Sequence, residues 1–129
     1  MILIAERDQT VRELQRYFLG KAGFDSWFVD DGEAALAKAR LSHPQLIITE
    51  ILIPKIDGLA LCRRLRDDPL THDIPVIVFS ILVAAARATE AGAKAFLRKP
   101  IVESIFLATI QDVIAAQPNV LMEQQWASK

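Results

Sequence analysis

The sequence predicts an α/β fold in which five parallel strands are covered on both faces by helices. Short apolar runs alternate with stretches of helical periodicity along the whole chain, which is typical of repeated strand–helix–strand units. The run 46–49 is too uniformly apolar to have a face in water, as expected for a central parallel strand. A length of 129 residues with 52% hydrophobic content fits one doubly wound domain.

Capping and turn residues predict where the elements of the first half begin and end. Asp8 stands where an N-cap would open a helix that Gly23 closes, and Asp31-Gly32 turns the chain into a second helix that His43-Pro44 stops. The apolar stripe of the first helix is expected to comprise Val11, Leu14, Phe18 and Leu19. The expected elements are strands over 2–5, 26–29 and 46–49 and a second helix over about 33–41.

Similar signals organise the second half. Asp57-Gly58 precedes a helix that Asp68-Pro69 ends, Gly92 closes a short helix, and Lys99-Pro100 breaks the chain before the last one. The expected elements are strands over 76–79 and 94–97 and helices over 84–91 and 102–116. We therefore expect one domain over 1–116, followed by a tail or the start of a linker over 117–129.

Charge and composition argue against several classes of protein. Fifteen Lys and Arg residues are balanced by 16 Asp and Glu residues without a basic block, which argues against a nucleic-acid-binding surface. Cys62 is the only cysteine, and no apolar run approaches the ~20 residues of a membrane span. The start of the chain lacks the pattern of a signal peptide. We expect a cytoplasmic location, no membrane contact and no disulfide.

The carboxyl ends of the strands are the expected position of a functional site. Ligands bind at this edge of doubly wound sheets, near the point where the strand order reverses. No glycine-rich phosphate loop and no Ser-His-Asp order is present, and His43 and His72 lack neighbours at metal-ligand spacing. The candidates just after each strand are Glu6, Arg7, Asp30, Asp31, Glu50, Ser80 and Lys99.

Several spaced motifs resemble the receiver domain of two-component response regulators over residues 1 to about 116. They are the acidic residue after the first strand, the P-x-x-D-G loop at 54–58, the strand PVIVFS ending in Ser80, the turn Gly92-Ala93, and Lys99-Pro100. The resemblance implies a flavodoxin-like (CheY-like) sheet of five parallel strands in the order 2-1-3-4-5, with five helices.

The resemblance also assigns roles to individual positions. In the family, two acids follow the first strand and an Asp follows the third. One of the two acids, that Asp and a backbone carbonyl hold Mg²⁺, the Asp accepts a phosphoryl group, and a Ser or Thr hydroxyl and a Lys bind the added phosphate. Here the acid pair falls on Glu6 and Arg7, the phosphoacceptor on Glu50, the phosphate-recognising groups on Ser80 and Lys99, the switch aromatic on Phe96, and a cis-proline on Pro100.

Arg7 and Glu50 depart from this pattern. Arg7 replaces a metal-binding carboxylate by a fixed positive charge, and Glu50 is one methylene longer than Asp, which displaces it from in-line phosphoryl-transfer geometry. We expect Arg7 to pair with Glu50 or Glu6 while Lys99 takes the other carboxylate. The site would then be neutral, with Mg²⁺ binding lost or weak, no other metal or cofactor, no catalytic residue and no enzymatic activity.

Other readings of the same residues stay open. Arg7 is alternatively a solvated side chain, and Ser80 a hydroxyl bonded to nearby backbone. Phe96 is expected to pack in the core, and Asp8 to cap a helix rather than to replace the phosphoacceptor.

The function expected from these features is that of an atypical receiver domain, not phosphorylated, that acts as a protein-interaction module in two-component signalling. Its partner, a histidine kinase, an output domain or a second copy, would bind the face of the fourth helix, fifth strand and fifth helix, beside the uncharged segment 81–86. The alternatives are a conventional switch that accepts phosphate from a histidine kinase on Glu50 or Asp8, and a flavodoxin-like domain that binds a small anion.

Overall fold

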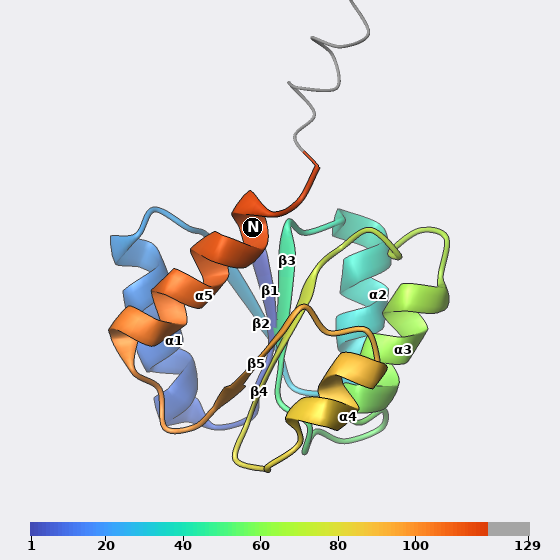
Figure 1. The fold of residues 1–129 in the computed structure, drawn as a ribbon, viewed down its shortest axis with the longest axis horizontal. Helices are drawn as coiled ribbons and strands as arrows, with labels where there is room; N and C mark the ends of the chain where they lie inside the picture. Colours follow the sequence, from blue (N-terminus) through green and yellow to red (C-terminus); the bar gives the residue numbers. More distant parts are fainter. Residues whose placement is uncertain (119–129) are drawn as a thin grey trace, which may run out of the picture.

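A five-stranded parallel sheet runs through the middle of the molecule and separates two layers of helices (Figure 1). The computed structural model describes residues 1–118, so the predicted tail 117–129 lies outside them except for its first two residues. The strand order β2-β1-β3-β4-β5 confirms the predicted fold and places β3 at the centre. Helices α1 and α5 cover one face, and α2, α3 and α4 cover the other. The strands are β1 Ile2–Ala5, β2 Ser26–Val29, β3 Leu46–Thr49, β4 Val76–Ser80 and β5 Ala95–Arg98, and the helices are α1 Gln9–Lys21, α2 Gly32–Ser42, α3 Gly58–Asp67, α4 Ala85–Glu90 and α5 Glu103–Ala115.

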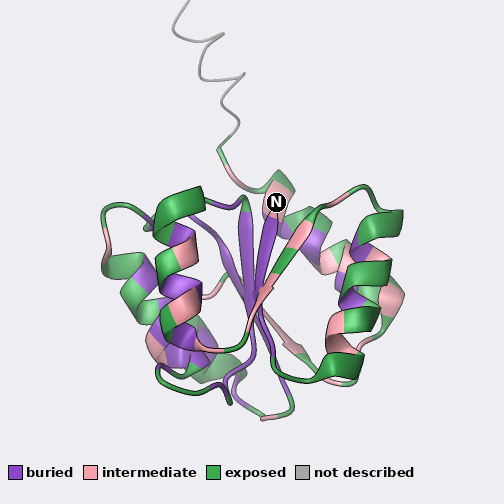
Figure 2. Ribbon diagram, turned by 180° about the vertical axis from the view of Figure 1, so that it is seen from behind, coloured by how far each residue is buried: buried purple, intermediate pink, exposed green. Residues whose placement is uncertain are grey.

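The inner strands β1, β3 and β4 are buried along their whole length (Figure 2). Their side chains contribute to two hydrophobic cores. Leu3, Ile47 and Val78 belong to the core beneath α2, α3 and α4. Ile4 and Ile48 belong to the core beneath α1 and α5, because successive side chains of a strand point to opposite faces. The absence of a solvent-facing side on these strands explains their uniformly apolar sequences.

Three aspartates cap helices. The sequence predicts the cap at Asp8, whereas at Asp31 and Asp57 it predicts only a turn before the next helix. Asp8 accepts a hydrogen bond from the Val11 backbone N–H at 3.1 Å, and Asp31 accepts one from that of Ala34 at 2.8 Å. Asp57 accepts two, from the residues at the start of α3, at 2.9 Å each. Each carboxylate satisfies backbone donors that a helix cannot bond internally. Asp8 is therefore held as a helix cap.

The last elements of the sheet differ from prediction by one residue. Ser80 pairs with Arg98 in register, so β4 and β5 both run one residue further than expected. Helix α4 has six residues, and its N-cap residue, Ala84, makes no side-chain hydrogen bond. The longest helices, α1 and α5, have 13 residues. Among residues 1–118, no helix is long and apolar enough to cross a membrane.

The inward face of α1 also differs from prediction. Leu14, expected in the apolar stripe, is 38% exposed, while Leu19 is fully buried as expected. Gln15, which a polarity pattern places outside, has no exposed surface, and its side-chain amide has no hydrogen-bond partner among the described residues. The rotation of α1 against the sheet therefore follows packing against its neighbours rather than the polarity of each residue.

Replacing Gln15 by Met is expected to increase the free energy of unfolding by about 1 kcal/mol. The substitution keeps the length of the side chain and removes a buried amide whose donors and acceptor are unsatisfied. Urea unfolding of the two proteins measures the difference. Gln9→Met, at the exposed start of α1, is the matched control and is expected to change stability by less than about 0.5 kcal/mol. A destabilised Gln15→Met protein would show that the amide is satisfied in solution.

Candidate functional site

The carboxyl ends of four strands bring the predicted site residues together. Glu50 follows β3, and its backbone N–H donates to the carbonyl of Ala5, the last residue of β1, at 3.0 Å. Glu6 follows β1 directly, so the two glutamates stand side by side at the centre of the sheet. Ser80 ends β4, and Lys99 follows β5. The sheet therefore places two carboxylates, one hydroxyl and one ammonium at one edge.

Lys99 binds both glutamates. Its Nζ lies 2.8 Å from Glu6 Oε1 and 3.0 Å from Glu50 Oε2. The three side chains are 11%, 4% and 6% exposed, so the ion pairs are largely shielded from water. A single ammonium thus occupies the space between two buried carboxylates.

The other carboxylate oxygens also accept hydrogen bonds. Glu6 Oε2 accepts from the backbone N–H of Asp8 at 3.1 Å. Glu50 Oε1 accepts from the Ser80 hydroxyl and from the backbone N–H groups of Ile51, at 2.6 Å, and Leu52, at 3.3 Å. All four carboxylate oxygens of the site therefore have a donor in the protein itself.

These contacts outweigh burial in setting the charges of the site. Burial on its own raises the pKa of Glu50, but the hydrogen bonds from Ser80 and Lys99, the charge of Lys99 and the Ile51 N–H together hold that pKa below its ordinary value. Burial likewise lowers the pKa of Lys99, but its hydrogen bonds to Glu6 and Glu50 and their charges raise it above the ordinary value. Glu50 is therefore ionised and Lys99 protonated near neutral pH.

Ser80 has a role beyond the local one that its sequence context favours. Its Oγ accepts from the backbone N–H of Leu82 at 3.2 Å, which confirms a bond to nearby backbone. The same hydroxyl also donates to Glu50, 30 positions earlier in the chain. The predicted hydroxyl position is thus part of the buried cluster Glu6–Glu50–Ser80–Lys99, which we call the glutamate–lysine cluster.

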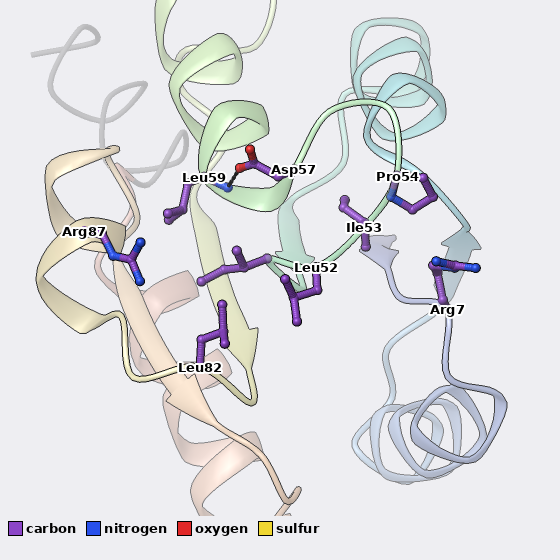
Figure 3. A pocket seen from close by; sticks show the side chains of 9 residues that line it. Arg7, Leu52, Ile53, Pro54, Asp57, Leu59, Leu82 and Arg87 are labelled. Carbon is purple, nitrogen blue, oxygen red and sulfur yellow. Dashed lines mark hydrogen bonds between the residues drawn. The ribbon is translucent and has the colours of Figure 1, made fainter.

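The prediction that Arg7 forms an ion pair with Glu6 or Glu50 is wrong. Arg7 is exposed, and no carboxylate within the described part of the chain lies within 4 Å of its guanidinium. Glu6 and Arg7 are adjacent at the end of a strand, and successive side chains of an extended chain leave on opposite sides. Glu6 points into the site, so Arg7 points out of it, to the edge of a neighbouring surface groove (Figure 3). Lys99, rather than Arg7, forms ion pairs with both Glu6 and Glu50.

Replacing Arg7 by Ala is therefore expected to change the free energy of unfolding by less than about 0.5 kcal/mol. Arg12, whose side chain is 16% exposed, is the contrasting position, because it donates to the Glu6 carbonyl and pairs with Asp30. Arg12→Ala should lower stability by about 1 kcal/mol or more. Urea unfolding of both variants measures the two effects. A larger loss for Arg7→Ala than for Arg12→Ala would mean that Arg7 enters the cluster in solution.

Arg12 is also a residue that the sequence did not single out. It joins the end of β1 to the end of β2 from a position on α1, and its two partners lie 6 and 18 residues away. Nothing in the local sequence distinguishes it from the other arginines of α1. Only the packing of α1 on the sheet brings these groups together.

Two further positions lie where the resemblance implies. The peptide bond between Lys99 and Pro100 is cis. Phe96, on β5, is half-buried and packs against the core beneath α2, α3 and α4, as expected from its apolar ring. Pro100 directly follows Lys99 at the end of β5, whereas Phe96 lies near the start of that strand.

The oxygen atoms that a divalent metal ion would need are already bonded within the glutamate–lysine cluster. Mg²⁺ requires several oxygen ligands in octahedral geometry. Here every carboxylate oxygen already accepts a hydrogen bond, and Lys99 occupies the space between Glu6 and Glu50. Across residues 1–118, no group of three or more His, Cys, Asp or Glu side chains is arranged to hold a metal ion.

Comparison with known proteins shows what this edge of the sheet is. The chain matches the response regulator receiver domain family over residues 2–111. It is 30% identical over 126 residues to the transcriptional regulatory protein CseB of Streptomyces avermitilis, a match that covers 92% of this chain and 52% of that protein. It is 32% identical over 107 residues to the alkaline phosphatase synthesis transcriptional regulatory protein PhoP of Bacillus subtilis, covering 77% and 42%. The chain therefore spans about half the length of these curated relatives or less.

A solved structure agrees with this result. The receiver domain of a signal transduction histidine kinase from Syntrophus aciditrophicus superposes with a TM-score of 0.82 and is 31% identical, and the match covers 92% of this chain and 94% of that one. The strand order, the cis peptide before Pro100 and the position of the cluster at the strand ends agree with the family match over nearly the whole described chain. This chain belongs to the response regulator receiver domain family.

Proposed function

We propose that this receiver domain acts in two-component signal transduction as a protein-interaction module that needs neither Mg²⁺ nor a phosphoryl group. The observation that carries the proposal is the position of Lys99, whose ammonium contacts both Glu6 and Glu50. An ordinary receiver site has to offer free carboxylate oxygens to a metal and to an incoming phosphoryl group. This site has none, because its own donors occupy all four.

The geometry of Glu50 supports the same conclusion. Phosphoryl transfer relies chiefly on placing the attacking oxygen in line with the leaving group. Glu50 is 6% exposed, and its Oε1 points toward Ser80 and the backbone of the loop that follows β3. An attack by Oε2 would require the carboxylate to leave Lys99. We therefore expect that Glu50 does not react with a phosphate donor.

The cluster has a net charge of −1 and is not neutral as the sequence predicts, but donors of the chain itself offset its carboxylate charges. With Arg7 outside, the cluster holds two carboxylates and one ammonium, and the backbone N–H groups of Asp8, Ile51 and Leu52 point at the carboxylate oxygens. Mg²⁺ would have to displace Lys99 and bury a divalent charge beside an ammonium. We infer that the cluster is a structural element that keeps the strand ends in a fixed arrangement.

The face formed by α4, β5 and α5 is the proposed partner surface. Receiver domains interact with histidine kinases and output domains, and this face exposes two large apolar side chains at the start of α5: Val102 is 49% and Ile105 55% exposed. A hollow of about 200 Å³ lies beside them, lined mainly by the end of β5 and the start of α5. Apolar groups gathered at one surface are typical of a protein-protein contact. A second copy of this chain is the other candidate for the same face.

A conventional phosphorylation switch is the second candidate function. It is favoured by Ser80 and Lys99, which converge on Glu50 as the phosphate-recognising residues of the family would converge on a phosphorylated Asp. In that case the phosphoryl group would be accepted by Glu50 or Asp8. Asp8 is the weaker acceptor because its carboxylate caps α1.

Incubation with acetyl phosphate and Mg²⁺, followed by intact-mass analysis, distinguishes the two functions. The full 129-residue chain is expected to remain unmodified. The double variant Arg7→Asp, Glu50→Asp, which restores the acid pair and the aspartate of the family, is the matched control for labelling on the same fold. A stoichiometric, base-labile phosphoryl adduct on the unaltered chain would support the switch and overturn the proposed function.

A further inference from the structure

A groove of about 570 Å³ lies beside the glutamate–lysine cluster and does not contain it (Figure 3). The loop between β3 and α3 forms its floor, Leu82 and Arg87 form one side, and Arg7 lies at the opposite end. The groove is therefore built from three segments that are far apart in the sequence. We call it the Arg7–Arg87 groove.

The floor of the groove is apolar and partly exposed. Leu52 is 55% exposed, and Figure 3 shows its side chain and that of Leu82 in the space between the two arginines. The apolar surface continues past Leu82 to Val83, which is 76% exposed, in the segment 81–86 that carries no charge. Neighbouring apolar side chains exposed in this way favour contact with another molecule.

The two ends of the groove carry positive charge without an internal partner. No carboxylate of the described chain lies within 4 Å of the guanidinium of Arg7 or Arg87. Asp57 also lines the groove, but its Oδ1 accepts two hydrogen bonds at the start of α3. Two guanidinium groups and one carboxylate leave the groove with a charge of +1, whereas the whole chain has a net charge of −1.

We propose that the Arg7–Arg87 groove binds an acidic, amphipathic peptide segment of a partner protein. Apolar side chains of the segment would lie on Leu52 and Leu82, and carboxylates on either side of them would pair with Arg7 and Arg87. A guanidinium binds a carboxylate through two parallel hydrogen bonds, which sets both position and direction. The charges lie at opposite ends of an apolar floor, and this favours an extended or helical segment over a compact anion.

This inference rests on the proposed function, because it names a second binding surface of the same interaction module. It also gives Arg7 a role. The position that resembles a metal-binding acid in the family holds a cation that faces outward instead of entering the cluster. The same substitution would thus remove a carboxylate from the metal site and create one half of a binding site for an acidic partner.

Selection of peptides from a random phage-displayed library on the immobilised 129-residue chain tests the proposal. The expected result is enrichment of peptides with large apolar residues flanked by Asp or Glu on both sides. Synthetic copies of the selected peptides should bind Arg7→Glu and Arg87→Glu at least tenfold more weakly, and Leu52→Asp should have a similar effect. Arg16→Glu, the same charge reversal on α1 in the opposite helix layer, should leave the affinity within twofold.

Three results would overturn the proposal. The first is selected peptides without acidic residues, and the second is binding that neither arginine substitution weakens. The third is loss of binding in Val102→Asp, which would move the contact to the α4-β5-α5 face and leave the proposed function intact. A charge swap would support the proposal directly: Arg7→Glu should lose binding to the acidic peptide, and a peptide with Lys in place of one acidic residue should restore it. Phosphorylation of the unaltered chain by acetyl phosphate would instead refute the proposed function, whatever the groove binds.

Discussion

Replacing Lys99 by Met is expected to lower the free energy of unfolding by about 3 kcal/mol at pH 7. The substitution keeps most of the apolar side chain but leaves Glu6 and Glu50 buried next to each other without a cation. Removing one partner of a buried ion pair typically costs about 3–5 kcal/mol, since the remaining charge is uncompensated. The 11% exposure of Lys99 places the expectation at the lower end of this range.

The effect should depend on pH in a defined direction. In the unaltered chain the pKa of Glu50 is lowered from its ordinary 4.5, so its contribution to stability is present above that pH and is lost as the pH falls through the folded-state pKa. The pKa of Lys99 is raised from 10.5, so its contribution is present below that pH and is lost as the pH rises through the raised value. Without Lys99, only the hydrogen bonds from Ser80 and Ile51 oppose the effect of burial on the pKa of Glu50, so we expect that variant to become less stable as the pH rises from about 4.5.

Urea unfolding of both proteins at several pH values between 4 and 8 measures this difference, which should widen toward neutral pH. Lys94→Met is the matched control. It makes the same chemical change at an exposed residue just before the other end of β5, and its effect should stay below about 0.5 kcal/mol throughout. If Lys99→Met is as stable as the Lys94→Met control at pH 7, Lys99 does not compensate buried charges on Glu6 and Glu50.

Replacing Gly58 by Ala is the other change with a large expected effect. A Cβ at this position would lie 2.2 Å from the carbonyl oxygen of Glu50 and 2.8 Å from the Cα of Ile51. These are backbone atoms that cannot turn aside, so the start of α3 and the loop after β3 must move apart. We expect a loss of about 3 kcal/mol from this overpacking and a displaced Glu50.

Gly20→Ala is the control for this prediction. Nothing lies within 4 Å of a Cβ at Gly20, which is within α1, and Ala is a better helix former than Gly by about 1 kcal/mol. The control should therefore be stabilised while Gly58→Ala is destabilised. Thermal unfolding of both variants and the unaltered chain shows whether each substitution raises or lowers stability. Equal stability of the two variants would show that the contact between Gly58 and Glu50 is looser than described.

The strands and helix starts were predictable because their causes are local. The apolar run of β3 is shielded from water on both sides only in an inner strand of a sheet that helices cover on both faces. Asp8, Asp31 and Asp57 bond backbone N–H groups two or three residues away, so each cap is visible within a short stretch of sequence. The residues that follow each strand could be named as site residues for the same reason.

The pairing within the site could not be predicted, because it depends on which way side chains leave the strand ends. Charge counting gave two cations and two anions, and only the structure shows that Arg7 points outward while Lys99 serves both glutamates. The burial of Gln15 was hidden in a similar way. Its environment is set by α1 lying against the sheet and α5, contacts that join distant parts of the chain.

Titration of the chain with Mg²⁺, followed through backbone amide NMR signals, shows whether the ion enters the glutamate–lysine cluster. We predict no saturable shift at residues 6, 50 or 99 of the unaltered chain at millimolar Mg²⁺, and saturable shifts at the same positions in the double variant Arg7→Asp, Glu50→Asp. Saturable binding to the unaltered chain with the affinity of the double variant would contradict the claim that Lys99 fills the place of the ion.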